Sequence, residues 1–493
     1  MRTGARLNGW LQKLMLGLTV AVLVTVDLGA PLFGITAVYA AGHGGESGQS
    51  KHPGLVPTPP YIVHMPVVAR SPSRSTSVFG VQMYGALDSS AAALDLAQTA
   101  GVSWVRWAFS WGSIEPQDTT PGQYDWTVTD ASFSAAKAAG LNVIATMTSN
   151  PSWAATYSGG RLDRAGVAPF AEFMAAAVER YDGDGKDDAP GSPVVNYWEL
   201  YNEPDGGDPI RARYGSGYWG PYGADYAQML CATYHAAKAA SPNAKIVLGG
   251  LAYDWFQEDG GPFVRAFLDD VLAAGGGRCV DAVAFHYYPV FESVWTPFGP
   301  GLSGKAHYLR SKLDAYGLSS LPLLVTEAGY HSNADPSWPS TPEIQAGYVI
   351  KLFTQAIASD ISTMIWFSWT DLPDYWAANG LLDFNQRPKP AYGALTVARR
   401  KLGAAFFERR LSDGETGSPS VEAYLFHPVF GLLYVIWLNG SGTHQIRLPG
   451  KIARVSGPAD ETLAKVLDAD DGVADGWITV TAGSGPIYVE IIE

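Results

Sequence analysis

Two glutamates stand in sequence contexts that suit paired carboxyl chemistry. Glu203 follows an apolar run within an Asn-Glu-Pro motif, and Glu327 ends a second apolar run within a Thr-Glu-Ala-Gly motif. Cleavage of a glycosidic bond needs two carboxyl groups across a cleft. One protonates the leaving oxygen, and the other attacks the sugar carbon or activates water. Glu203 and Glu327 are therefore the candidate catalytic residues, provided that the fold brings them face to face.

A regular alternation of strand-like and helical segments predicts that fold. Apolar strand-like runs begin near residues 78, 103, 141, 194, 245, 280, 321 and 363. Segments with helical spacing lie between and after them, at residues 89–100, 127–139, 167–181, 224–240, 262–274, 303–316, 342–359 and 388–402. Strands that are apolar throughout, each followed by a helix, predict an α/β fold of the (β/α)8 TIM-barrel type. An open doubly wound sheet is the alternative, but it would carry a phosphate-binding glycine turn after an early strand, and none stands there.

The barrel would place the two glutamates opposite each other. Catalytic groups of such barrels lie at the C-terminal ends of the strands and in the loops that follow. Glu203 ends the fourth predicted strand and Glu327 ends the seventh. Strands four and seven lie on opposite sides of an eight-stranded ring, so we expect the two side chains to face each other across its mouth. A lone glutamate after a strand would indicate a helix cap or a surface group, whereas two in these contexts indicate a site.

The composition divides the chain into four segments. Residues 1–40 have a basic start, an apolar run over residues 14–26 and a Val-Tyr-Ala cleavage pattern, which predict a signal peptide. Residues 41–77 are rich in Pro, Gly and Ser and predict a linker. Residues 78–403 form the predicted catalytic barrel. Short strand runs at residues 421–426, 432–438, 444–448, 477–481 and 487–492 predict a C-terminal antiparallel β-sandwich over residues 404–493, expected to pack on the barrel rather than to bind sugar.

Charge and export signal limit the partners. The formal net charge of −14 argues against nucleic acid or an anionic membrane as the main partner. The signal peptide predicts a secreted, extracellular protein with no membrane span after cleavage, and we expect a monomer. The common esterase motif Gly-x-Ser-x-Gly and the zinc-protease motif His-Glu-x-x-His are both absent from the sequence. No cofactor or metal is needed, because two carboxyl groups supply both the acid and the nucleophile.

The motifs resemble those of the large clan of retaining barrel glycoside hydrolases. Within it the chain is most similar to glycoside hydrolase family 39, with the cellulase-like family 5 as a near neighbour. Besides the two glutamate motifs, the resemblance rests on five segments, at residues 105–107, 111–116, 122–126, 284–289 and 366–369. It implies a glycosidase with Glu203 as acid/base and Glu327 as nucleophile, Asn202 bonded to the sugar 2-hydroxyl, and Arg106 keeping Glu327 ionised. The retaining mechanism also implies carboxyl groups about 5–5.5 Å apart.

Further side chains are expected around the pair. His286 and Tyr288 are two apart on a strand and share a face. If that face is the barrel interior, Tyr288 bonds the nucleophile and His286 contacts substrate. Trp366 is the predicted stacking platform for the sugar, with Trp369 as the second choice, whereas Trp104 and Trp107 are expected to pack.

The loops after the strands carry many of the aromatic residues, which make up 12% of the chain. Flat rings bury the C–H faces of sugars well, so part of this set predicts a cleft for several sugar units, and the rest is expected to pack loops together. The residues are Trp153, Tyr157, Tyr214, Tyr218, Trp219, Tyr222, Trp255, Phe256, Phe291, Trp295, Phe298, Tyr330, Trp338, Tyr375 and Trp376. Trp153 is the one placed among the substrate-binding candidates.

Several alternatives stay open at this point. Residues 182–188 resemble a calcium loop but lack its terminal glutamate, so a solvated Asp/Gly turn competes with a metal site. Cys231 and Cys279 are either bridged or free. A polysaccharide or oligosaccharide is the expected substrate. A non-catalytic carbohydrate-binding barrel and a transglycosylase using the same two glutamates are the alternative functions.

Overall fold

The computed structural model describes residues 77–493, except 85–87, 89, 211–216, 336–337 and 373–376. The predicted signal peptide over residues 1–40 and the linker over 41–77 lie outside the described residues, apart from Ser77. Three of the loop aromatics, Tyr214, Tyr375 and Trp376, also lie outside them. Among the helices of the described part, none combines the length and apolar character needed to cross a bilayer.

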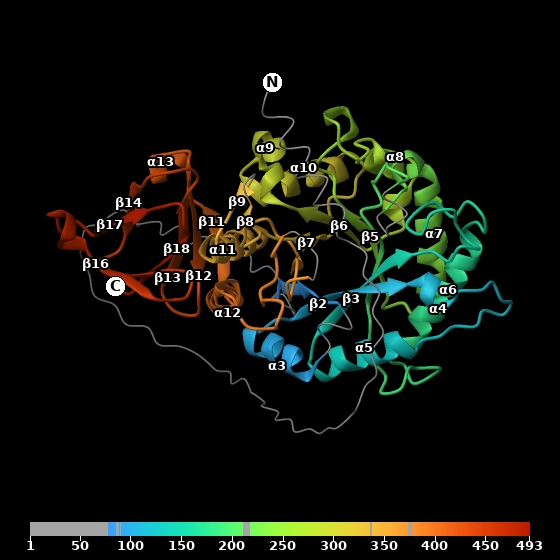
Figure 1. Cartoon of the computed structure of the whole chain (residues 1–493). Coiled ribbons are helices and arrows are strands. Elements are labelled where there is room, and N and C mark those ends of the chain that lie inside the picture. The colour runs from blue at the N-terminus through green and yellow to red at the C-terminus, as the bar shows by residue number, and fades with distance from the viewer. Residues whose placement is uncertain (1–76, 85–87, 89, 211–216, 336–337, 373–376) are drawn as a thin grey trace, which may run out of the picture. The chain divides into compact units, whose positions relative to one another are not determined.

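Eight parallel strands close into a barrel, which confirms the predicted fold (Figure 1). Their order around the ring is β1-β10-β7-β6-β5-β4-β3-β2. The strands are β1 (Phe79–Gln82), β2 (Trp104–Ser110), β3 (Asn142–Ser149), β4 (Tyr197–Asn202), β5 (Lys245–Leu251), β6 (Ala282–Tyr287), β7 (Leu323–Ala328) and β10 (Met364–Trp366). They are apolar along their length because one face packs inside the barrel and the other packs against helices.

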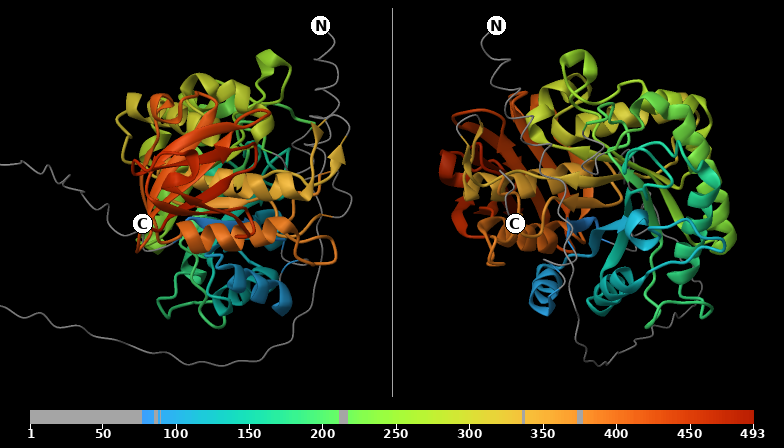
Figure 2. Two further views of the ribbon diagram at one scale, coloured as in Figure 1. Left: turned by 90° about the vertical axis from the view of Figure 1, so that its left-hand side faces the viewer. Right: turned by 45° about the vertical axis from the view of Figure 1, so that its right-hand side comes forward.

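A helix follows each barrel strand at the predicted place. These helices are α3 (Ala91–Ala100), α5 (Thr127–Ala138), α6 (Val167–Arg180), α7 (Gly223–Ala240), α8 (Phe267–Ala273), α10 (Gly301–Ala315), α11 (Pro342–Ala358) and α12 (Pro390–Leu402). Short elements in the loops are α4 (Trp111–Ile114), α9 (Glu292–Trp295), β8 (Ala334–Asp335) and β9 (Trp338–Pro339). Thr341 shows how a boundary is encoded, since its hydroxyl accepts the backbone N–H of Ile344 and Pro342 opens α11. Helices α11 and α12 run side by side in each view (Figures 1 and 2).

The C-terminal part is built from antiparallel sheets, as predicted for a β-sandwich. A six-stranded sheet has the order β11-β12-β13-β18-β15-β16, and β14 pairs with β17 separately. The strands are β11 (Phe406–Arg410), β12 (Val421–His427), β13 (Leu432–Leu438), β14 (His444–Pro449), β15 (Ile452–Ser456), β16 (Thr462–Leu467), β17 (Trp477–Ala482) and β18 (Ile487–Ile491), with α13 (Asp413–Thr416) between β11 and β12. Strands β11, β15 and β16 were not predicted. Strands β11 and β16 lie at the sheet edges and are largely exposed, so their sequences lack a clear apolar alternation.

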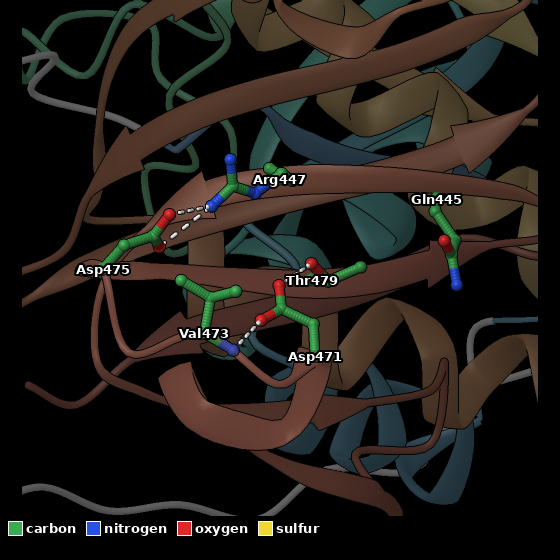
Figure 3. A pocket seen from close by; sticks show the side chains of 6 residues that line it. All are labelled: Gln445, Arg447, Asp471, Val473, Asp475 and Thr479. Atoms are coloured by element: carbon green, nitrogen blue, oxygen red, sulfur yellow. Dashed lines mark hydrogen bonds and ion pairs between the residues drawn. The ribbon is translucent and has the colours of Figure 1, made fainter.

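The outward face of the β14–β17 pair carries an open hollow of about 520 Å³. Figure 3 shows its lining side chains, with Arg447 paired to Asp475 and Asp471 bonded to Thr479. All of its lining residues belong to the C-terminal sheets or to the loop before β17.

Side chains of the barrel helices share an apolar cluster with the sandwich. Tyr424 on β12 and Trp437 on β13 are buried in the same cluster as Phe353 of α11. Polar contacts join the same elements, because Gln355 Nε2 donates to Glu422 Oε2 at 3.0 Å. The sandwich therefore covers an apolar face of the barrel, in the packing role that the sequence analysis expected.

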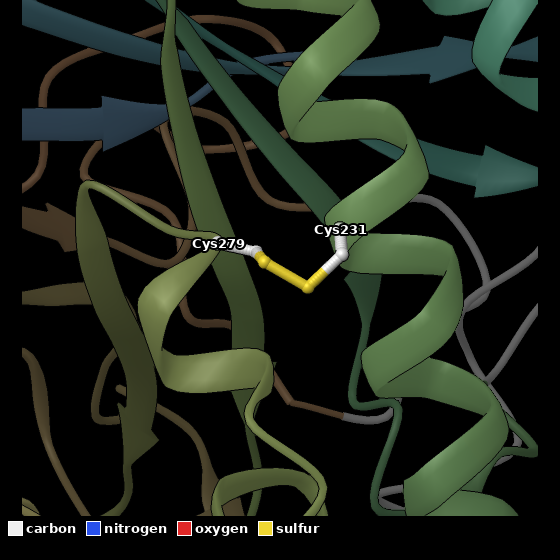
Figure 4. The surroundings of a disulfide bond; sticks show 2 residues. All are labelled: Cys231 and Cys279. Atoms are coloured by element: carbon white, nitrogen blue, oxygen red, sulfur yellow. A yellow bond between two sulfur atoms is a disulfide. The ribbon is translucent and has the colours of Figure 1, made fainter.

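A disulfide bond settles the state of the two cysteines. Cys231 in α7 is bonded to Cys279, which precedes β6, and their Cα atoms are 4.8 Å apart (Figure 4). The bond joins positions 48 residues apart in sequence and ties the helix that follows β4 to the start of β6.

Candidate active site

The inside of the barrel is apolar at one level and polar above it. Seven buried residues form the apolar layer, with Tyr197 packed against it: Trp104, Ile144, Val247, Ala282, Ala284, Leu324 and Ile365. Two residues further along the strands, the inward positions become polar, as at Arg106 on β2 and Glu199 on β4. Trp107, with the opposite parity, packs outward among the helices, so both Trp104 and Trp107 are packing residues as expected.

Arg106 is the centre of the polar layer. Its Nε donates to Glu199 Oε2 at 2.7 Å and its Nη2 donates to Asn202 Oδ1 at 2.7 Å. Its Nη1 donates to Gln82 Oε1 at 3.1 Å and to Glu327 Oε2 at 3.4 Å. The guanidinium, only 4% exposed, thus links β1, β2, β4 and β7 in a fixed fork.

Glu199 is a buried member of the site that the sequence analysis did not single out. Besides Arg106, its carboxylate accepts hydrogen bonds from Thr146 Oγ1 at 2.6 Å and Thr326 Oγ1 at 2.5 Å. Burial by itself would raise the pKa of Glu199, but Arg106, His286 and the two hydroxyls outweigh it and hold the pKa below its ordinary value. Glu199 is therefore ionised and is the nearest counter-charge of Arg106. The available signal was strand parity: Glu199 comes two residues after Tyr197, so the two side chains share the inner face of β4.

The backbone turns sharply where β4 ends. Tyr201 has a φ of 69° and Glu203 a φ of 48°, both in the left-handed region that non-glycine residues rarely adopt. Pairing with β5 passes from Leu200 to Asn202 across Tyr201. The side chains of Glu199 and Asn202 consequently both reach Arg106, although strict alternation would put them on opposite faces.

Glu203 lies beside His286. The Nδ1 atom of His286 is 3.1 Å from Glu203 Oε1, and both side chains are buried. Burial lowers the pKa of His286 to about 4, so the imidazole is neutral at neutral pH. Room for the ring comes from Gly250, where a Cβ atom would lie 2.3 Å from His286 Nε2.

Glu327 lies beside Tyr288, as predicted for the nucleophile. The Tyr288 hydroxyl donates to Glu327 Oε1 at 2.5 Å. Burial raises the pKa of Glu327, the charge of Glu203 adds to the rise, and His286, Arg106 and Tyr288 only partly offset it. Arg106 thus favours the ionised form of Glu327 less strongly than the sequence analysis expected, because Glu199 takes its closer contact.

The two candidate catalytic carboxyl groups come together at the mouth of the barrel. One oxygen of Glu203, one nitrogen of His286 and one oxygen of Glu327 lie within 4.8 Å of one another. The groups arrive from β4, β6 and β7, and each is buried. A bond placed between the two side chains would have a carboxyl group on each side.

The prediction that Trp366 is a stacking platform is wrong. Its side chain is fully buried in the outer apolar cluster, and its indole N–H donates to the backbone oxygen of Asn379 at 2.9 Å. The reason is parity, because Ile365 belongs to the inner layer and its neighbour Trp366 must therefore face the helices. Trp369 is also fully buried. Phe367, the next residue on the inward side, lies edge-to-face against Tyr84 at 6.4 Å.

Tyr84 is a second neighbour of the pair that the sequence analysis missed. It follows β1, and burial together with the charge of Glu327 raises the pKa of its hydroxyl. Tyr84 is therefore neutral and close enough to Glu327 to feel its charge. No motif marked it, because it lies past the end of a four-residue strand.

The loop aromatics divide into packed and partly exposed groups. Trp219, Phe256 and Trp295 are almost fully buried and fill the loops, as expected for part of the set. Tyr157, Tyr218 and Tyr222 form a chain of edge contacts on a half-exposed surface. Trp153 is partly buried and lies between the two groups. Its ring centre is 5.1 Å from that of Trp111, and its indole N–H donates to the backbone oxygen of Glu115.

The acidic loop after α6 brings three carboxylates together. Oxygens of Asp182, Asp184 and Asp188 lie within 4.8 Å of one another. The same side chains accept backbone N–H groups of their own loop, at Asp184, Gly185 and Lys186. Such contacts also occur in metal-free turns, so calcium binding stays a prediction.

Comparisons with known proteins point to carbohydrate-active enzymes. The family described as Cellulase (glycosyl hydrolase family 5) matches residues 69–372, which is more than half of the chain. No curated protein matches the chain in sequence. Among solved structures, a family 39 glycoside hydrolase from Bacteroides cellulosilyticus has a TM-score of 0.63 at 20% identity, covering 84% of this chain and 80% of that one.

Two further structures share the fold. A family 39 β-xylosidase from Caulobacter crescentus has a TM-score of 0.55 at 15% identity, covering 85% of this chain and 97% of that one. A family 30 endoxylanase from Clostridium papyrosolvens has a TM-score of 0.53 at 13% identity, covering 84% and 97%. The likeness to family 39 is thus one of fold, whereas family 5, the predicted near neighbour, is matched in sequence. Both results agree with the predicted clan.

Proposed function

Because the chain belongs to the cellulase family, glycosyl hydrolase family 5, and is a glycosidase, we propose that it is an exported, retaining enzyme that cleaves a polysaccharide or oligosaccharide by double displacement. The observation that carries the proposal is the approach of Glu203 and Glu327, since an oxygen of one lies within 4.8 Å of an oxygen of the other. Such an approach supports the carboxyl spacing of about 5–5.5 Å in retaining enzymes over the spacing of about 6.5–9.5 Å that leaves room for water in inverting enzymes.

The donors around the pair support a division of roles. Two buried carboxyl groups this close do not ionise together readily, so the pair holds one proton at moderately acidic pH. Tyr288 and Arg106 both donate to Glu327, which favours its ionised form as the nucleophile. Glu203 faces a neutral imidazole instead, and we assign the shared proton to Glu203, where the leaving oxygen needs it.

The reaction then follows two steps. The Glu327 carboxylate attacks the anomeric carbon while Glu203 gives its proton to the departing oxygen, which leaves a glycosyl ester on Glu327. Glu203, now ionised, takes a proton from water, and the water attacks the anomeric carbon and releases Glu327. Arg106 holds the side-chain oxygen of Asn202, so the amide nitrogen of Asn202 points away from the guanidinium. This nitrogen is then available to donate to a substrate hydroxyl.

Replacement of each glutamate tests the assignment. Glu327→Ala should abolish hydrolysis, by about 10⁴-fold or more, with melting temperature and circular dichroism close to those of the wild type. Glu203→Ala should lose far more activity on substrates with poor leaving groups than on activated aryl glycosides, since only the former need protonation. Substantial turnover by Glu327→Ala, or equal losses on both substrate types by Glu203→Ala, would overturn the roles.

The stereochemical outcome tests the retaining mechanism separately. A panel of polysaccharides and aryl glycosides identifies a substrate, and proton NMR of the first-formed product reports its anomeric configuration. Retention is expected, and an inverted product would refute double displacement. Transfer to an added sugar in place of water would indicate the transglycosylase alternative.

Export is proposed from the N-terminal sequence pattern and is consistent with the disulfide bond, since such bonds persist in oxidising compartments. N-terminal sequencing of protein recovered from the host's exterior should begin at Ala41. An intact Met1 terminus would contradict cleavage.

A further inference from the structure

Three buried charged side chains gather around the segment that follows β5, outside the catalytic pair. Lys305 on α10 and Asp205 after β4 are both 0% exposed, and Asp254 after β5 is 4% exposed. A buried charge lowers stability unless it is paired and hydrogen-bonded. Their contacts converge on Ala252 and Tyr253, just beyond Gly250, whose oxygen accepts the N–H of Glu203.

Lys305 holds the segment that follows β5. Its Nζ donates to the backbone oxygen of Ala252 at 2.5 Å and to Asp254 Oδ1 at 2.9 Å. The indole N–H of Trp295 donates to the same Asp254 oxygen at 2.8 Å, and the Lys305 ammonium lies 5.1 Å from the centre of the Trp295 ring. The ammonium is thus fixed by an oxygen, a carboxylate and an aromatic face.

Asp205 holds the same segment from the other side. Its carboxylate accepts the backbone N–H of Ala252 at 3.1 Å and that of Tyr253 at 2.7 Å. Ala252 is therefore bound through its N–H to Asp205 and through its oxygen to Lys305. Asp205 is only two residues beyond Glu203, whose own N–H donates to the Gly250 oxygen at 2.9 Å. The ends of β4 and β5 are clamped together.

The clamp coincides with backbone strain. Glu203 has a φ of 48° and Tyr253 a φ of 44°, and both are non-glycine residues in the left-handed region. Such conformations persist only where the surrounding contacts hold them. Asp205 bonds the N–H of Tyr253 directly and follows Glu203 by two residues, so it contacts one strained position and adjoins the other.

We propose that Asp205 and Lys305 are positioning residues that hold Glu203 in its strained conformation, from which it protonates the leaving oxygen. The inference rests on the proposed role of Glu203 as the acid/base. Loss of either contact to Ala252 would let the turn that carries Glu203 relax, and its carboxyl group would lose its alignment with the leaving oxygen.

A comparison of leaving groups tests the proposal. Kinetics of the full-length protein on a substrate with a poor leaving group and on an activated aryl glycoside report how much protonation by Glu203 each variant keeps. Asp205→Asn and Lys305→Met should each lower kcat by about 10-fold or more on the poor leaving group and much less on the activated one, with KM little changed on both.

A matched control is available on the same helix. Lys312→Met breaks the half-exposed contact of Lys312 with Asp269 and should leave kcat on both substrates unchanged. Equal losses of kcat on both substrates, or values within about twofold of the wild type on both, in variants that melt cooperatively would overturn the proposal. If Lys305→Met does not fold, Asp205→Asn decides alone, since its amide keeps one of the two acceptors. Wild-type protein and Glu203→Ala are measured alongside. If Glu203→Ala shows the leaving-group dependence and the two variants do not, this inference fails while the proposed glycosidase mechanism stands.

Discussion

Individual hydrogen bonds set the chemistry of the two candidate catalytic carboxyl groups. Both are buried, so their difference comes from their partners rather than from solvent. Glu327 accepts from a phenol and lies within 3.4 Å of a guanidinium nitrogen, whereas Glu203 lies beside an uncharged imidazole. A partner that donates only to one carboxyl group lowers the proton affinity of that group alone. Tyr288 is the clearest such partner.

Tyr288→Phe should move the acidic limb of the kcat/KM profile to higher pH. The Tyr288 hydroxyl stabilises the ionised form of Glu327, so its removal raises the pKa of Glu327, already raised by burial. A hydrogen bond to a charged group contributes about 1.5–3 kcal/mol, which corresponds to roughly one pH unit or more. Tyr287→Phe is the control, because Tyr287 directly precedes Tyr288 but packs among the outer residues. An unchanged acidic limb in Tyr288→Phe would argue against Glu327 as the group that must be ionised.

Most of the residues in the site could be predicted because they belong to motifs with a known chemical role. Glu203, Glu327, Tyr288 and His286 were placed by strand parity and by motif, and the structure brings them together. Glu199 was missed because strand parity alone, its one signal, does not distinguish a mid-strand glutamate of the site from a structural one. Its partner Arg106 comes from 93 residues away, and sequence patterning does not report such pairs.

At the level of elements, the alternation of strands and helices was predictable, and the orientation of short strands was not. Each barrel strand was recognisable because parallel strands buried on both faces are continuously apolar. The same feature hides which residues face inward, and this is why Trp366 was assigned to the wrong side of β10. The exposed edge strands β11 and β16 escaped prediction for the opposite reason, since they are too polar.

The disulfide between α7 and the start of β6 predicts a measurable stabilisation. Closing a loop of 48 residues restricts the unfolded chain and stabilises the fold by about 3–4 kcal/mol in the chain-entropy model. A Cys231→Ala/Cys279→Ala variant should show that loss in urea unfolding, with kcat unchanged at 25 °C because α7 lies on the outside of the barrel. Wild-type protein kept in reductant should unfold at the same urea concentration as the variant. An equal midpoint for variant and oxidised wild type would contradict the prediction.

For the whole molecule, the sandwich completes the apolar core of the barrel helices. Tyr424, Trp437 and Tyr488 are buried in the cluster that also contains residues of α11 and α12. Aromatic side chains of this size bury about 150–250 Å² each. Removing the sandwich would expose a contiguous apolar face, which favours aggregation.

A chain truncated after Gly403 should therefore be insoluble or melt well below the full-length protein. Soluble yield, size-exclusion chromatography and thermal melting report the outcome. A monodisperse truncated barrel that melts within about 2 °C of the full chain would show that the sandwich is not a structural partner. Its sugar affinity would then become the more important property to measure.

The apolar layer beneath Arg106 and Glu199 determines from which side substrate and water reach the site. The barrel is filled there, with almost no exposed surface, by Trp104, Ile144, Val247, Leu324 and Ile365. Neither water nor sugar passes through the barrel at that level. Substrate, the hydrolytic water and both products therefore reach and leave Glu203 and Glu327 from the opposite side of this layer.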